Sequence, residues 1–235
     1  MSPLPSIANI LGPACIGIIV SSIIFGINCL QLYFYYTKYA NGDGATLKIY
    51  VSALMVVDTL HVLLLVISYY HYTVTYFGDI FALAYGYWTL LAEVAVGGLL
   101  VTMVQLYFAF RVYTLSGKCT LLPVVISILS ICGLALSIVF TVVGLEIHLF
   151  ASGERLKPYS AAGLSAELAC DVLIAGTLIY YLHAKRTVFP RTNRAINLLI
   201  MYALNTCLLT TIFTIIDLTL YTPALCCLRS TLART

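Results

Sequence analysis

Six stretches of this chain are apolar over about 20 residues or more, the length that an α-helix needs to cross the hydrocarbon core of a bilayer. They lie at residues 10–36, 49–70, 86–112, 120–147, 161–182 and 195–221. Short spacers with turn residues separate them, among them Asn41-Gly42-Asp43-Gly44 and Ser116-Gly117-Lys118. Gly and Pro in such spacers end helices because they free or fix the backbone φ angle. The pattern predicts an all-α integral membrane protein, a bundle of six transmembrane helices.

The composition excludes a soluble fold. Of the 235 residues, 62% are hydrophobic and 9% are charged, whereas a soluble domain has about 45–50% apolar and about 25% charged residues. The chain leaves no room for a second domain, so we expect one transmembrane bundle over residues 1–221 and a short tail over 222–235. A net charge of +3 is too small to indicate nucleic-acid binding. The expected partner is the lipid bilayer, and the sequence indicates no oligomeric state.

The positions of the basic residues predict how the bundle is oriented. The first, third and fifth spacers and the helix ends beside them contain Lys38, Lys48, Arg111, Lys118, Lys185, Arg186, Arg191 and Arg194. The N-terminus and the second spacer contain none, and the fourth spacer contains Arg155 and Lys157. Short cytoplasmic loops are enriched in Lys and Arg. We therefore expect the N-terminus to face the outside or a lumen; the plasma membrane fits this orientation, but the sequence leaves the compartment open.

Several short motifs together resemble a known family. They are Asp58-Thr59-Leu60-His61, Phe77-Gly78, Gln105-Leu106-Tyr107-Phe108-Ala109-Phe110-Arg111-Val112-Tyr113, Asp171-Val172-Leu173-Ile174-Ala175, Tyr180-Tyr181-Leu182, Arg186-Thr187, Asn193, Ile196-Asn197, Tyr202 and Asn205-Thr206-Cys207-Leu208-Leu209-Thr210. As a set they resemble fungal, chiefly basidiomycete, multi-pass membrane proteins that share the domain of unknown function 6534. The resemblance covers roughly residues 10–221.

The resemblance implies a seven-helix bundle with its N-terminus outside, and it implies no activity, ligand or catalytic residue. This chain departs from that pattern at its C-terminal end. Only the fourteen residues 222–235 follow the sixth apolar stretch, so the last helix of the family is expected to be missing.

Ionisable residues inside the apolar stretches are the candidate functional residues. Asp58 and His61 lie in the second stretch, three residues apart and so on one helix face. Glu93 lies in the third stretch and Asp171 in the fifth. A charge at the centre of a transmembrane helix costs about 2.5–3.5 kcal/mol on insertion scales, and no Lys or Arg is expected at the same depth. These four residues form the candidate intramembrane polar site.

Two interpretations of the polar site remain open. The carboxyls can form a site for a small polar ligand, an ion such as a cation, or a proton between the second, third and fifth helices, or they can form interhelical hydrogen bonds to His61, Asn28 or Gln105 that only fix packing. A metal site is disfavoured, because zinc needs three or four converging ligands and the other His residues are expected near the membrane surfaces. No cofactor is expected: every Lys falls in a spacer or at a helix edge, which disfavours a retinal protein.

The leading hypothesis is a receptor- or sensor-like helical bundle, not an enzyme. It is based on architecture alone, which is analogy. The alternative is a small-solute or proton-coupled transporter that uses Asp58, Glu93 and Asp171. Transport of labelled solutes in proteoliposomes separates the two hypotheses.

Overall fold

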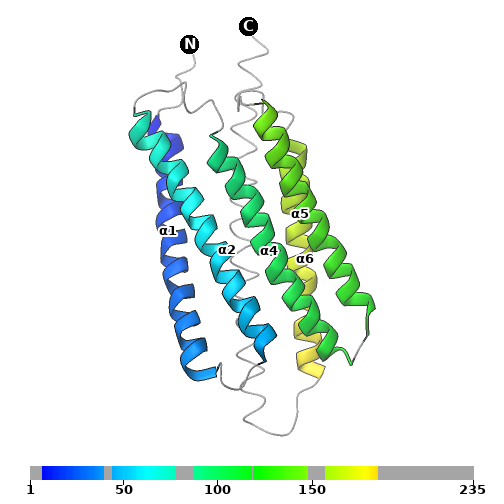
Figure 1. The fold of residues 1–235 in the computed structure, drawn as a ribbon. Helices are drawn as coiled ribbons and strands as arrows, with labels where there is room; N and C mark the ends of the chain where they lie inside the picture. The colour runs from blue at the N-terminus through cyan, green and yellow to red at the C-terminus, as the bar shows by residue number, and fades with distance from the viewer. Residues whose placement is uncertain (1–6, 40–43, 78–86, 118, 148–156, 185–235) are drawn as a thin grey trace. The chain divides into compact units, whose positions relative to one another are not determined.

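The computed structural model describes residues 7–39, 44–77, 87–117, 119–147 and 157–184, which form long helices (Figure 1). Two of these helices end in a short π-helical turn, in which the hydrogen bond reaches one residue further than in an α-helix. The elements are α1 (Ile7–Phe34) with η1 (Tyr35–Tyr39), α2 (Ala45–Tyr70) with η3 (His71–Thr75), α4 (Trp88–Leu115), α5 (Leu121–Ile147) and α6 (Lys157–Ala184).

The first five apolar stretches are confirmed as helices, with ends that differ from the expected ones by a few residues. Five helices among the described residues are long and apolar enough to cross a membrane. The sixth expected stretch, 195–221, and the tail, 222–235, lie outside the described residues, so the count of six stays a prediction. The described part of the chain contains helices and no strand.

Local sequence explains where the helices begin and end. Pro158 is the second residue of α6 and Pro123 the third of α5; in the first turn a missing N–H costs no intrahelical hydrogen bond. After α4, Gly117 takes a left-handed φ of 70°. Glycine carries no Cβ and so ends a helix in this conformation without strain. The spacer predicted at Ser116-Gly117 is therefore a helix stop.

The chain divides into two compact units, and the division falls inside α4 and α5. Unit 1 contains Pro3–Met103 and Ser137–Tyr159, and unit 2 contains Val104–Leu136 and Ser160–Thr235. In unit 1, α1 packs on α2. The expectation of a single transmembrane domain stays a prediction.

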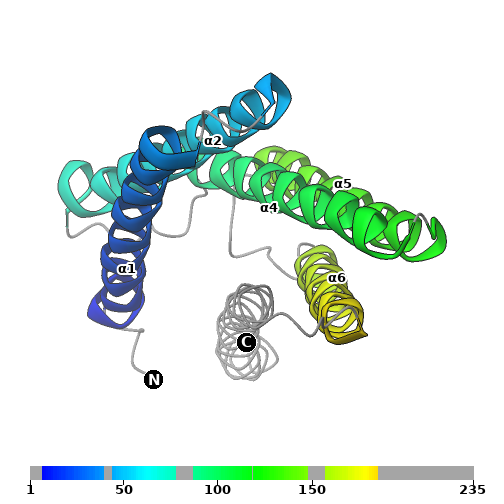
Figure 2. The same cartoon turned by 90° about the horizontal axis from the view of Figure 1, so that it is seen from below.

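The core of unit 2 is built from three helices. Ala109 and Val112 come from α4, Ile126 comes from α5, and residues of α6 spaced four apart complete the cluster, namely Cys170, Ile174 and Leu178. Figure 2 shows α4 and α5 side by side. Residues three or four apart share a helix face, so the α6 spacing presents one continuous stripe to the other two helices.

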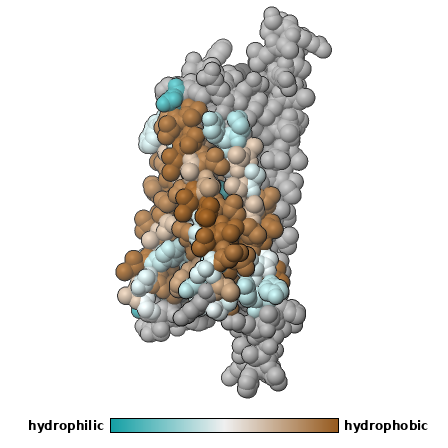
Figure 3. All heavy atoms as spheres, turned by 90° about the vertical axis from the view of Figure 1, so that its right-hand side faces the viewer, coloured by the Kyte–Doolittle hydropathy of each residue, from teal (hydrophilic) through white to brown (hydrophobic). Residues whose placement is uncertain are grey.

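The outer surface of the described residues differs from that of a soluble protein. Polar side chains are among the most buried, with Thr89 at 0%, Ser130 at 2% and Gln105 at 3% exposure, whereas large apolar side chains such as Ile49, Val56 and Leu121 are 68–74% exposed. On the face shown in Figure 3, apolar residues cover most of the coloured surface and polar ones lie mainly toward its ends. Such a surface is stable in lipid, and the protein is membrane-embedded.

Several buried hydroxyls donate to carbonyls of their own helices. Ser68 donates to the Leu64 carbonyl at 2.8 Å, Thr102 to the Gly98 carbonyl at 2.8 Å and Ser130 to the Ile126 carbonyl at 2.9 Å. Because lipid offers no hydrogen-bond partner, a Ser or Thr in a transmembrane helix needs such an internal acceptor.

Candidate functional site

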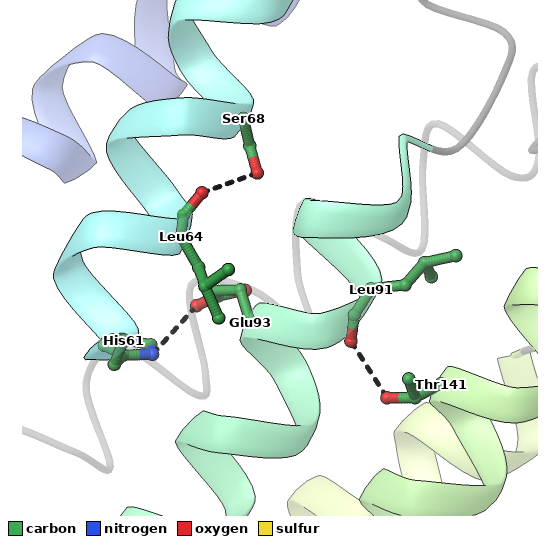
Figure 4. Close-up of polar contacts among 6 residues, drawn as sticks. All are labelled: His61, Leu64, Ser68, Leu91, Glu93 and Thr141. Atoms are coloured by element: carbon green, nitrogen blue, oxygen red, sulfur yellow. Dashed lines mark hydrogen bonds and ion pairs between the residues drawn. The ribbon is translucent and has the colours of Figure 1, made fainter. Parts of the chain in front are cut away.

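His61 of α2 and Glu93 of α4 meet in unit 1. The imidazole Nδ1 lies 3.4 Å from the carboxyl Oε1, and the two side chains are 21% and 18% exposed (Figure 4). This is an ion-pair distance, but the contact lacks hydrogen-bond geometry, and Nδ1 has no hydrogen-bond partner in the described part of the chain. Two of the four residues expected to form the polar site are therefore in contact.

Gly97 makes room for the imidazole. It lies one turn after Glu93 on α4, and a Cβ placed on it would be 3.4 Å from Cε1 and 3.5 Å from Nδ1 of His61. The imidazole thus lies against the backbone of α4, with Glu93 beside it. A methyl group at position 97 would be in van der Waals contact with the ring.

Asp58 connects the pair to α1. It precedes His61 by three residues on α2, and its Oδ2 accepts a hydrogen bond from Nδ2 of Asn28 on α1 at 2.9 Å. Asn28 is one of the partners that the sequence indicated for the acids. The three titratable residues Asp58, His61 and Glu93, together with Asn28 and Gly97, are called the unit 1 polar group below.

Basic residues are remote from this group along the helices. In the candidate spans of α1, α2 and α4, the Lys and Arg residues are Lys48, in the first turn of α2, and Arg111, near the end of α4. A helix rises about 1.5 Å per residue, so Lys48 lies roughly 20 Å from His61 along α2. The Lys and Arg residues of these spans are therefore too distant to form ion pairs with the acids of the group.

Further polar contacts join α2 and η3 to α4 and the residue before it. Ser68 and Thr89 share a hydrogen bond of 2.8 Å, the backbone N–H of Tyr87 donates to the Tyr72 hydroxyl at 2.8 Å, and the Tyr50 hydroxyl donates to the Met103 carbonyl. His71 stacks on the Tyr87 ring at 3.6 Å and 10°.

We call these contacts and the His61–Glu93 pair the α2–α4 seam. Sequence reasoning missed the seam as a unit. In each contact, the residue number on the α2 side and the residue number on the α4 side add to nearly the same sum, as expected for two antiparallel helices.

Asp171 belongs to unit 2 and has its own partner there. Nε2 of Gln105, which is 3% exposed, donates to Oδ1 of Asp171 at 3.1 Å. Glu167 lies one turn earlier on α6, and its Cγ would be 3.6 Å from a Cβ placed on Gly133. The sulfur of Cys170 lies 3.4 Å from the Ser130 hydroxyl. Gln105 is the second amide partner indicated by the sequence. That Asp171 shares a site with Asp58 stays a prediction.

No metal centre is formed in the described ranges, where no group of three or more His, Cys, Asp or Glu side chains could hold a metal ion. The side chains of the unit 1 polar group can transfer protons and form hydrogen bonds. An imidazole, two carboxyls and an amide provide both donors and acceptors.

The comparison with protein families concerns the end of the chain. Residues 167–233 match DUF6534, a family of unknown function. The match begins at Glu167 in α6 and includes Asp171 and Cys170, so it confirms the family resemblance for this segment. No curated protein and no solved structure matches the chain. Because the function of DUF6534 is unknown, the match assigns no activity to the polar groups.

Proposed function

We propose that this membrane-embedded DUF6534 protein is a receptor- or sensor-like bundle without catalysis, whose ligand acts on the unit 1 polar group. The observation that carries the proposal is the 3.4 Å contact between His61 of α2 and Glu93 of α4. A contact between ionisable groups of two helices changes its strength when either group gains or loses charge. A ligand that binds there shifts the equilibrium between closed and open helix pairs.

The surroundings of His61 support a non-catalytic role. Nucleophilic catalysis needs a nucleophile within hydrogen-bond reach of the base. Among the described contacts of His61, the ring meets Glu93 and the Gly97 position and no hydroxyl or thiol. The Glu93 carboxyl faces the His61 imidazole, so the two ionisable side chains contact each other.

We propose the orientation with the N-terminus outside or in a lumen. The Tyr50–Met103 contact brings the beginning of α2 to α4, and Lys48 lies in that first turn of α2. Lys at a helix end favours the cytoplasmic surface. The end of α2, with His71 and Tyr72, then lies at the opposite surface.

Transport is the second candidate function. The observation that favours it is that three described helices each carry a carboxyl within a candidate span, namely Asp58, Glu93 and Asp171. Intramembrane carboxyls are typical of ion and proton pathways. In a transporter the amides of Asn28 and Gln105 hold two of the acids between transport steps.

Distance measurements combined with flux assays separate the two functions. Spin labels at Val56 of α2 and Leu99 of α4 are placed on exposed positions of unit 1, 68% and 41% exposed. We expect the distance between the labels to change on a pH step or on adding a panel of small amines and alkali cations, while proteoliposomes accumulate none of these solutes. The change should be lost in Glu93→Gln. Accumulation above that of protein-free liposomes would overturn the sensor and favour the transporter.

A further inference from the structure

We infer that the ligand of the unit 1 polar group is the proton: Asp58, His61 and Glu93 form a proton-binding group inside the membrane. The inference is based on the proposed function and names its ligand. It follows from three observations, which are the space around His61, the number of charges in the group and the absence of a basic residue in the neighbouring helical turns of the described spans.

The space between His61 and Glu93 favours a proton over larger ligands. Nδ1 and Oε1 are 3.4 Å apart, and Gly97 on the adjacent turn of α4 leaves only contact distance to the ring. An amine nitrogen in line between these two atoms would need hydrogen bonds of about 2.7–3.2 Å to each of them and so a gap of more than about 5 Å; at the observed spacing an amine could bind only beside the pair. A proton bound to either the imidazole or the carboxyl needs no such gap.

Charge counting gives the number of protons. With all protons removed, Asp58 and Glu93 each carry one negative charge and His61 is neutral. The group is therefore neutral when it holds two protons, and each proton gained or lost leaves one unit of net charge. A net charge is unfavourable between transmembrane helices, because lipid does not solvate it. The closed α2–α4 seam is thus the neutral form, and a third proton favours an open, hydrated form.

The neighbouring elements do not supply a counter-charge. In the described part of unit 1, α1 contributes the neutral amide of Asn28, α2 contributes Asp58, and α4 contributes Glu93. Glu146 near the end of α5 is exposed, and the next imidazole, His71, stacks on Tyr87 ten residues along the chain. Lys48 is at the far end of α2. Protons are the remaining means of neutralising the acids.

Three variants test the group directly. The whole chain in lipid nanodiscs is titrated between about pH 5 and about pH 8, where imidazole charge changes, with infrared difference spectra for carboxyls and ¹⁵N resonances for imidazoles. We expect one imidazole resonance that titrates and is lost in His61→Gln. We expect a protonated-carboxyl band that is lost or diminished in Glu93→Gln or Asp58→Asn. The inference is overturned if neither signal depends on these residues.

Two glycine substitutions, one as the test and one as its control, leave every titratable group unchanged. Gly97→Ala places a methyl 3.4–3.5 Å from the ring, whereas Gly26→Ala on α1 meets nothing within 4 Å. We expect Gly97→Ala to shift the midpoint of the His61 resonance and Gly26→Ala to leave it unchanged. Equal midpoints in all three proteins would show that the seam does not control the titration and would overturn the inference.

The same samples distinguish failure of the inference from failure of the proposed function. If His61 and Glu93 titrate but the Val56–Leu99 label distance stays constant, the proton site stands and the sensor function fails. If the labels move only on adding Na⁺ or ethylamine at constant pH, the sensor function stands and the proton inference fails. A carboxyl band that changes with Na⁺ at constant pH would likewise overturn the proton inference and leave the sensor function standing.

Discussion

Asn28 of α1 donates a hydrogen bond to Asp58 of α2 across 2.9 Å, near the middle of both candidate spans. The candidate span of α1, Ala14–Thr37, has none of its most apolar window buried. Apolar contacts with lipid and with protein are nearly equivalent in free energy, so they do not fix the orientation of such a helix. The hydrogen bond supplies a directional contact between α1 and α2, and the Tyr36 hydroxyl adds two more at the end of the same span, to the Lys48 carbonyl and the Ser52 hydroxyl.

Replacing Asn28 tests this role. Asn28→Leu should destabilise the α1–α2 contact by about 0.6 kcal/mol, and by no more than about 1.7 kcal/mol, because these are the values for hydrogen bonds between transmembrane helices. Asp58→Asn should cost less, since an amide still accepts the hydrogen bond. Unfolding of the chain in mixed micelles measures both. Val56→Ala, on the lipid-exposed face of α2, is the control; an equal loss there would show that the hydrogen bond is not specific.

Gly144 of α5 should not tolerate a side chain. A Cβ placed there would lie 2.6 Å from Cδ2 and 3.3 Å from Cδ1 of Leu91, and Leu91 is 1% exposed and so has little space to move. The Leu91 carbonyl also accepts a hydrogen bond from Thr141 at 2.9 Å (Figure 4). We expect Gly144→Ala to cost about 1–3 kcal/mol, as overpacking does.

A second substitution identifies the cause of that loss. In a Leu91→Ala background the methyl at position 144 has space, so Gly144→Ala should then cost much less. Gly176→Ala on α6, where nothing lies within 4 Å, should be close to neutral throughout. Unfolding in mixed micelles is again the measurement, and an unchanged cost in the Leu91→Ala background contradicts the steric explanation.

Apolar run length predicted the helices well, because a helix must be about 20 residues long to cross the hydrocarbon core. It could not predict which helix faces contact each other. A helix that is apolar on all sides has little sequence periodicity that would indicate its rotation about its own axis. The contact of His61 with Gly97 depends on helix register and was therefore missed. The amide partners Asn28 and Gln105 could be named, because buried acids need donors and few are present in the apolar stretches.

Gln105 and Asp171 should be energetically coupled in unit 2. The amide donates to the carboxyl at 3.1 Å, and Gln105 is 3% exposed. A double-mutant cycle with Gln105→Leu and Asp171→Leu should give a coupling free energy of about 0.6 kcal/mol, the average for membrane hydrogen bonds. The lipid-exposed pair Leu106 and Val172 provides a control cycle. Coupling no larger than in the control would mean that the hydrogen bond adds nothing to stability.

The orientation of the helices gives the last prediction. With the N-terminus outside, α1 crosses inward and α2 crosses outward, so Phe77, which follows η3 and is 87% exposed, faces the outside. After α4 crosses inward, the exposed Cys119 faces the cytoplasm. In a chain whose other cysteines are replaced by Ala, an impermeant maleimide should label Phe77→Cys in intact cells and Cys119 only after permeabilisation. The reverse result would invert the positive-inside assignment, and labelling of both positions in intact cells would show that α4 does not cross the membrane.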